Sequence, residues 1–464
     1  MVAGCVLLLT QIVAAQLPAD PEWVHIVGAH DAPYKKNIYK VTDYGAISDG
    51  ATLNTKAIQK AIDVCSSKGG GLVVFAPGKY LTGALFLKQS VRLQIDRGVE
   101  LMGSQHLEDY PEMDTRVAGI EMKWPAALIN VIDKGDIAIT GEGIINMQGK
   151  AFWDSYLKLS KDYEPKGLAW AVDYDAQRPC TILISGSSNV TVRGVTLQEA
   201  GFSTIEILYS KFITVDGIGI RNNIDANGPA TDGVVIDSSS YILVQNCNVD
   251  CNDDDFSLKA GRDADGLRVN RPTEYVLIRN SVLGSGGNMI TIGSETAGSI
   301  RHVLVTGLIG NGARTGFNLK SGITRGGTVE DIHFQNITMN GTANVLQVNL
   351  NSDPSYPKLP DGYKEKDAPA HWKKLLAKVE PALGIPHLQD IYFNYVYAKA
   401  AKKAIDVAGI KEARLNGFHF DNVSIEAATA GQIEYANNWT FYHTTIITAD
   451  GSKVNIKEST GVAP

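Results

Sequence analysis

Asn189-Val190-Thr191-Val192-Arg193-Gly194-Val195 sets a pattern that the chain repeats along much of its length. Similar runs of alternating apolar and polar residues occur at 211–218, 241–247, 275–280, 302–307, 331–336 and 390–395. The first six runs begin 22 to 34 residues apart, a period typical of one turn of a solenoid. Alternation directs Val and Ile inward, while Gly and Asn mark the corners. The sequence therefore predicts an all-β fold, a right-handed single-stranded parallel β-helix.

A capping helix is expected ahead of the first coils, at residues 54–65, with Asn54 as a candidate N-cap. Apolar residues at helical spacing share one of its faces, namely Ile58, Ala61, Ile62 and Cys65. Three glycines, Gly69-Gly70-Gly71, mark its end. Such a helix can cover the open end of a solenoid and protect its edge.

We expect one domain over residues 16–464, preceded by a signal peptide at 1–15. The first residues form a short apolar run that ends in small residues, with cleavage expected after Ala15. That run is too short for a membrane span. Export predicts a secreted or periplasmic protein. It would leave four cysteines, which could pair or serve as small buried residues: Cys65, Cys180, Cys247 and Cys251.

The repeat is interrupted at residues 352–387, which contain a short helical pattern at 370–377. Long insertions cost little, yet long ordered loops are often functional. Two interpretations follow: a tolerated surface insertion, or an ordered segment that walls one end of the groove.

An acidic cluster carries the chemistry. Asp253 and Asp254 are adjacent, and Asp232 lies 21 residues upstream of Asp253. Positions one coil apart in a β-helix stack about 4.8 Å apart, so Asp232 should lie near Asp253. Adjacent residues of a strand point to opposite faces, so Asp253 and Asp254 can share the groove only across a corner or bulge. Crowded carboxylates split their pKa values into an acid and a base, which glycosidic hydrolysis requires.

Charge limits the partners. The formal net charge is only −7, and the sequence has no basic stripe. Nucleic acid is therefore not expected as a partner, whereas an anionic sugar polymer could be bound by a few local Lys and Arg residues.

From about residue 40 to 440 the chain resembles glycoside hydrolase family 28, the polygalacturonase family. The family's Asn-Thr-Asp motif corresponds to Ala230-Thr231-Asp232, and its Asp-Asp motif to Asp253-Asp254. Its Gly-His-Gly motif corresponds to Gly287-Asn288-Met289, and its Arg-Ile-Lys motif to Asn318-Leu319-Lys320. The stretch at 261–268 resembles an insertion of bacterial, exo-acting members.

The resemblance implies an inverting hydrolase of pectic polysaccharide, exo-acting on galacturonan or rhamnogalacturonan oligosaccharides, with no cofactor or metal. Asp253 would protonate the leaving oxygen, while Asp232 and Asp254 hold and deprotonate the attacking water. Inverting pairs are usually about 6.5–9.5 Å apart to admit that water. The expected substrate-binding residues are Lys320, Asn288, Asn318, Arg262 and Lys259.

Two departures from the family pattern fall in the sugar-recognition residues. Asn288 replaces a histidine, so it can donate a hydrogen bond but cannot titrate. Asn318 replaces an arginine whose fork would grip a carboxylate. The carboxylates are kept, which favours changed specificity over lost activity and makes rhamnogalacturonan fragments as good a candidate as polygalacturonate.

Two other functions remain open from the sequence. Polysaccharide lyases also use parallel β-helices, and in that case Asp253, Asp254 and Asp255 would bind calcium. The third possibility is a glycan-binding solenoid that has kept the groove but lost turnover.

Overall fold

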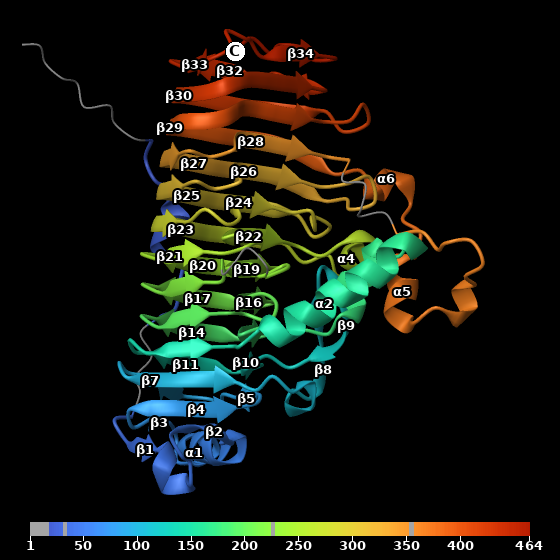
Figure 1. Cartoon of the computed structure of the whole chain (residues 1–464). Helices are drawn as coiled ribbons and strands as arrows, with labels where there is room; N and C mark the ends of the chain where they lie inside the picture. Colours follow the sequence, from blue (N-terminus) through green and yellow to red (C-terminus); the bar gives the residue numbers. More distant parts are fainter. Residues whose placement is uncertain (1–17, 31–34, 224–227, 352–356) are drawn as a thin grey trace, which may run out of the picture.

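A computed structural model describes residues 18–30, 35–223, 228–351 and 357–464, and this part of the chain is a parallel β-helix (Figure 1). Its long sheet contains only parallel pairings, and the strands stack in three columns along the axis. The prediction of a right-handed parallel β-helix is confirmed. The signal peptide expected at 1–15 lies outside the described residues.

The first column, here called the groove column, carries the site described below. It consists of β5 (Leu85–Phe86), β10 (Ile129–Ile132), β13 (Ile182–Ser185), β16 (Ile205–Leu208), β19 (Val234–Asp237), β22 (Phe256–Lys259), β24 (Asn288–Ile292), β26 (Thr315–Lys320) and β28 (Asn344–Asn349).

The second column follows it in each coil. It consists of β1 (Ile38–Lys40), β3 (Gly71–Val74), β6 (Val91–Gln94), β11 (Gly135–Thr140), β14 (Ser188–Arg193), β17 (Lys211–Asp216) and β20 (Ser240–Gln245). The third consists of β2 (Asp49–Leu53), β4 (Gly78–Thr82), β7 (Val99–Gly103), β12 (Ile144–Asn146), β15 (Thr196–Gln198), β18 (Gly219–Arg221) and β21 (Asn248–Asp250).

Toward the C-terminus the strands lengthen and run across a corner from one column into the next. These are β23 (Thr273–Leu283), β25 (Ile300–Asn311), β27 (Thr328–Asn340), β29 (His387–Ala408) and β30 (Leu415–Glu434). The final coil contains β31 (Ala436–Asn437), β32 (Thr440–Tyr442), β33 (Thr445–Thr448) and β34 (Asn455–Lys457).

The corner between the second and third columns explains the Gly and Asn punctuation. At the same place in successive coils φ is positive: 63° at Gly217, 57° at Asn246, 52° at Asn280, 67° at Gly307 and 52° at Asn336. Glycine and asparagine tolerate this left-handed region better than other residues. Between corners, inward residues such as Val190 and Val192 are fully buried, as the alternation predicts.

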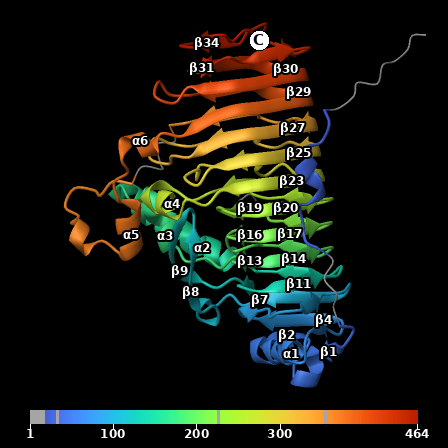
Figure 2. The ribbon, with the colours of Figure 1, turned by 180° about the vertical axis from the view of Figure 1, so that it is seen from behind.

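The N-terminal end is covered by α1 (Thr55–Ser67) (Figures 1 and 2). The apolar face predicted for this helix is buried. Asn54 occupies the N-cap position, but its side chain does not cap the helix. Its Oδ1 instead accepts a hydrogen bond from the Ile47 amide at 2.7 Å. The side chain thereby stabilises the preceding loop.

The remaining helices and one hairpin lie on the side of the groove column (Figures 1 and 2). The hairpin consists of antiparallel β8 (Glu112–Val117) and β9 (Ile120–Pro125). The helices are α2 (Lys150–Tyr163), α3 (Val172–Asp175), α4 (Asp263–Val269), α5 (Ala370–Leu375) and α6 (Pro381–Gly384). None of the helices in the described part of the chain is both long and apolar enough to cross a membrane.

The insertion predicted at 352–387 is described from residue 357 onward, and residues 352–356 lie outside the described part. It contains α5 and α6, and the repeat resumes with β29 at His387. The four cysteines have free thiols; Cys65, Cys247 and Cys251 are buried in the stacked core, whereas Cys180 is only partly buried.

Candidate active site

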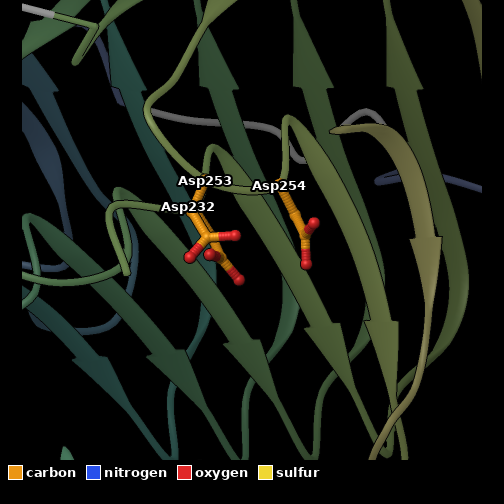
Figure 3. A group of neighbouring side chains, drawn as sticks. All are labelled: Asp232, Asp253 and Asp254. Atoms are coloured by element: carbon orange, nitrogen blue, oxygen red, sulfur yellow. The ribbon is translucent and has the colours of Figure 1, made fainter. Parts of the chain in front are cut away.

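The three acidic residues predicted from the sequence meet in one pocket on the groove column (Figure 3). One carboxylate oxygen from each of Asp232, Asp253 and Asp254 lies within 4.8 Å of the others. Asp232 lies two residues before the start of β19, and Asp253 and Asp254 lie in the turn between β21 and β22. This turn is the corner that the sequence required for both side chains to reach the groove. Pairing of Val234 with Phe256 brings the two segments into register.

Asp253 has the properties of an acid. Its side chain is 36% exposed. Burial, together with the negative charges of Asp254 and Asp232, raises the pKa of Asp253 to about 7, against the opposing effect of Lys320 and Arg314. A carboxyl group with this pKa is largely protonated in mildly acidic solution, so it can donate a proton.

Asp254 has the opposite character. Burial disfavours its charge, yet Lys320 and two hydrogen bonds lower its pKa below the usual value. Its Oδ1 accepts hydrogen bonds from Thr291 Oγ1 at 2.6 Å and from Asn288 Nδ2 at 2.7 Å. Lys320 Nζ lies 3.7 Å from Oδ2. Asp254 is therefore held as a carboxylate.

Asp232 lies between these two cases. Its Oδ2 accepts hydrogen bonds from Ser257 Oγ at 3.1 Å and from Lys259 Nζ at 3.2 Å. Burial nevertheless raises its pKa, with Lys259 opposing the shift and Asp254 adding to it. The cluster thus divides into one acid and two groups that can orient a water molecule.

The two lysines predicted as substrate contacts both line the pocket. Lys259 ends β22, and Lys320 ends β26. Burial alone would lower the pKa of Lys259, but the surrounding carboxylates, first among them Asp232 and Glu295, raise it well above the usual value. Both lysines therefore stay charged: Lys320 lowers the pKa of Asp254, and Lys259 opposes the rise that burial causes in the pKa of Asp232.

The two asparagines differ from each other in position. Asn288 bonds to Asp254, as described above, and not to Asp253, the residue assigned as the acid. Asn318 on β26 is 8% exposed, and its Nδ2 donates to Thr291 Oγ1 at 3.2 Å. Neither is among the residues that line the pocket. Both act through the hydrogen bonds that hold Asp254.

Arg262 lies in the pocket wall and not among its lining residues. Its Nε donates to Asp263 Oδ2 and its Nη1 donates to Tyr174 Oη, each at 2.8 Å. Its backbone amide donates to the carbonyl of Gly119, in the turn of the β8–β9 hairpin. This arginine joins its own segment to α3 and to the hairpin, and its expected contact with substrate stays a prediction.

The hairpin itself was not anticipated from the sequence. Its residues from Thr115 to Gly119 line the pocket, as do Trp124 and Pro125. Arg116 attaches it to the groove column through Asp237 Oδ1 at 2.8 Å and Ser238 Oγ at 2.7 Å. The side chain of Arg116 is 1% exposed. The hairpin is thus fixed over the ends of the strands and turns an open groove into a pocket.

The insertion lies behind this hairpin. Leu375 of α5 is buried against Val117, Ile120 and Trp124, and Lys374 Nζ donates to the Glu121 carbonyl. The described residues of the insertion do not line the pocket. A wall at one end of the groove therefore stays a prediction, and the contacts seen for the insertion are with the hairpin that lines the pocket.

Other pocket residues were also missed by the sequence. Glu206 on β16 faces the pocket, and burial raises its pKa to about 8 in spite of Lys259. Arg314, just before β26, does not line the pocket, but its half-exposed side chain lies beside the acid, with Nη2 3.6 Å from Asp253 Oδ1. Neither residue belongs to a motif, so only the strand register could have indicated them.

The calcium set considered for a lyase does not form. Asp255 is fully buried, and its Oδ1 accepts a hydrogen bond from the Cys251 amide at 3.1 Å. The acidic group of described residues with metal-like spacing contains Asp232 in its place. Lys259 and Lys320 already neutralise that group, so these residues do not fit a calcium site.

Comparisons with known proteins agree with this geometry. A probable polygalacturonase of Vitis vinifera is 27% identical over 398 residues, which cover 84% of this chain and 74% of the relative. An exo-poly-alpha-D-galacturonosidase of Dickeya chrysanthemi is 29% identical over 340 residues, which cover 66% of this chain and 56% of the relative.

Solved structures show the same fold. An exopolygalacturonase from Thermotoga maritima superimposes with a TM-score of 0.78 at 23% identity, covering 90% of this chain and 94% of that one. The family 28 exopolygalacturonase of Yersinia enterocolitica gives 0.75 at 24% identity, covering 92% and 78%. The model of glycosyl hydrolases family 28 matches residues 71–357, more than half of the sequence. With the acidic cluster inside that range, the chain belongs to family 28 of the glycoside hydrolases.

Proposed function

We propose that this glycoside hydrolase cleaves pectic polysaccharide from a chain end, with Asp253 as general acid and Asp254 and Asp232 orienting and deprotonating the water. The observation that carries the proposal is the split of acidities among three adjacent carboxylates. Asp253 is raised to a pKa of about 7, whereas Asp254 is lowered. Hydrolysis of a glycosidic bond needs one protonated and one ionised carboxyl group.

In this mechanism the leaving oxygen takes the proton of Asp253. Water attacks the anomeric carbon from the other face and gives a proton to the Asp254 and Asp232 pair. Lys320 keeps Asp254 ionised before the attack, because its ammonium lies within 4 Å of an Asp254 oxygen, and Lys259, equally close to Asp232, opposes the rise in the pKa of that carboxyl group. General acid–base assistance of this kind contributes about 10²–10⁴-fold.

The stereochemical outcome needs its own support. The nearest carboxylate oxygens lie within 4.8 Å, closer than the roughly 6.5–9.5 Å of most inverting pairs. The two distances differ in kind, because the smaller one joins the nearest oxygens and the larger one separates whole carboxyl groups. Inversion is supported by the family, and by the hydrogen bonds and ion pairs that occupy Asp232 and Asp254 and leave neither as a free nucleophile.

Exo action is supported by the shape of the site. The pocket has the groove column as its floor and the β8–β9 hairpin and Asp173 of α3 as walls. A walled pocket admits a chain end more readily than the middle of a polymer. Two relatives, from Dickeya chrysanthemi and Zea mays, have names that denote exo-acting galacturonan hydrolases.

The substrate class is galacturonan or rhamnogalacturonan oligosaccharide, since Asn288 and Asn318 depart from the family pattern. Localisation in the periplasm or outside the cell is proposed from the apolar run at 1–15 alone.

Product analysis on defined pectic oligosaccharides tests the function. Wild type should release one sugar at a time from the non-reducing end, and proton NMR of the first product should show the inverted anomer. Asp253→Asn should lower kcat by about 10²–10⁴-fold while substrate still binds. Asp96→Asn, at an exposed position of the same type, should leave kcat unchanged.

Three outcomes would contradict the proposal in different ways. Activity of Asp253→Asn within threefold of wild type would reject the acid. An unsaturated product absorbing in the ultraviolet would indicate a lyase. Binding by wild type with no released sugar would indicate a glycan-binding protein.

A further inference from the structure

The position where the family pattern has an arginine carries no charge in this chain. Asn318 donates to Thr291 Oγ1 at 3.2 Å, and Thr291 in turn donates to Asp254 at 2.6 Å. Asn318 is almost fully buried. It therefore belongs to the hydrogen bonds that fix Asp254, and it offers nothing that could neutralise a substrate carboxylate.

A different arginine stands close to this place. Arg314 immediately precedes β26, and two neighbouring coils fix its backbone. Its amide donates to the Gly287 carbonyl at 2.8 Å, and its carbonyl accepts from the Asn344 amide at 3.0 Å. The pairing of Asn288 with Thr315 sets Arg314 directly beside Gly287 in the next coil. Gly287 has no side chain that could separate Arg314 from the acid.

The guanidinium of Arg314 is oriented but not saturated. Nε donates to Asn288 Oδ1 at 3.2 Å, and Nη2 lies 3.6 Å from Asp253 Oδ1, beyond ordinary hydrogen-bond length. Within the described residues Nη1 makes no hydrogen bond. The side chain is 54% exposed. Asn288, which replaces a histidine in the family pattern, thus acts as the acceptor that aims this arginine.

The charge of Arg314 is available during catalysis. The acid must be protonated when substrate binds, and a neutral Asp253 no longer balances a guanidinium. The leaving oxygen accepts a hydrogen bond from Asp253, so the sugar that departs lies next to the acid. A carboxylate on that sugar would come within reach of two N–H groups of Arg314.

We propose that Arg314 binds the carboxylate of the departing sugar residue and so makes the enzyme selective for an acidic leaving group, an inference that rests on the proposed function above. In this chain the positive charge is at position 314 and not at position 318. The carboxylate of the departing sugar is therefore bound at a different place from the one that the family pattern indicates. Arg314 is a residue that determines specificity, whereas Lys320 lies beside Asp254 and lowers its pKa. Charge-assisted hydrogen bonds to a planar guanidinium give such a contact its direction.

The test compares Arg314→Ala with wild type on a digalacturonide and on its methyl ester at the reducing residue. Arg314→Ala should lower kcat/KM on the free acid by about tenfold or more and on the ester by less than about twofold. Arg314→Lys should recover part of the loss, since it keeps the charge without the fork. Arg301→Ala is the matched control, because Arg301 is also partly exposed but pairs with Glu274 at 2.8 Å.

The alternatives give different results. Equal losses on acid and ester would mean that Arg314 acts only through Asp253, and the inference would be wrong. Unchanged kcat/KM on both, or a wild type that cleaves only substrates with a neutral departing sugar, would also overturn it while leaving the proposed function intact.

A wild type without turnover on any pectic substrate would reject the proposed function alone. In that case calorimetry still decides the role of Arg314. Asp232→Asn should bind trigalacturonate at least about tenfold more tightly than the Asp232→Asn, Arg314→Ala double variant. Equal affinities would reject the inference.

Discussion

Asp253 and Asp254 are adjacent in sequence yet titrate in opposite directions, because the turn before β22 gives them different neighbours. Asp254 faces Thr291, Asn288 and Lys320. Asp253 has the guanidinium of Arg314 at 3.6 Å and the charge of Lys320 near it, and these do not outweigh burial and the two neighbouring carboxylates. One residue of separation along the chain is therefore enough to make one carboxyl group an acid and the other a carboxylate.

The pH dependence of activity follows from Asp253. Its pKa is raised to about 7, and the acid works only when protonated, so kcat should be full in mildly acidic solution and fall as the pH rises through about 7. Arg314 opposes the raised pKa, so Arg314→Ala should move this alkaline limb to higher pH. A pH–rate profile of both proteins provides the measurement. A profile that stays flat to pH 9 would show that Asp253 is not the acid.

Most of the individual residues in the site could be predicted from the sequence. Asp232, Asp253, Asp254, Lys259 and Lys320 were all placed in the site by motif and coil spacing, and the structure brings them together. Arg314 and Glu206 were not found, because their position depends on which strands stack in register, and no local pattern encodes that.

Among the elements, the coils were predictable and the pocket walls were not. Each coil repeats the same alternation, so its signal recurs along the chain. The β8–β9 hairpin has similar alternation but pairs with itself, and its closure over the groove depends on Arg116 and Asp237, which are distant in sequence. Helix α2 likewise gave no signal that would place it beside the groove. Long-range contacts, not local propensity, decide both positions.

Support of the hairpin by the insertion gives a prediction for α5. Leu375 is 3% exposed and packs against the hairpin. Leu375→Ala should leave a cavity that costs about 2–5 kcal/mol. We expect the hairpin to loosen, KM for short oligosaccharides to rise, and internal cuts in polygalacturonate to increase, as measured by viscosity against released reducing ends. Leu383→Ala in α6, at an exposed residue of the same insertion, should change neither quantity. An unaltered product pattern in a well-folded Leu375→Ala variant would show that the insertion does not affect the shape of the pocket.

The molecule as a whole is a stack in which each coil contacts its neighbours, so its stability is largely the sum of local interfaces. In the C-terminal half the core contains a file of stacked rings. Phe393 and Phe420 lie with centroids 4.7 Å apart, as do Phe420 and Phe441. The alternation predicted that apolar residues would point inward, but not that successive coils would align aromatic rings, since the lengths of the intervening loops set that register.

The part of this file from Phe393 to Phe441 lies beyond the coils of the active site, and Phe317 of β26, with its ring centroid 5.1 Å from that of Phe393, joins it to them. Phe420 on β30 is 3% exposed, and β29 and β28 lie between its coil and the β26 strand that carries Lys320. Phe420→Ala should therefore lower the free energy of unfolding by about 3–5 kcal/mol and reduce the melting temperature measured by calorimetry. It should leave kcat/KM unchanged at temperatures well below the transition, because the coils that hold the three carboxylates keep their own packing. Tyr442→Ala, in the next strand but 65% exposed, should have little effect on either quantity. A loss of activity in Phe420→Ala at temperatures where it remains folded would show that strain passes along the stack into the pocket, and that the coils do not act as nearest neighbours alone.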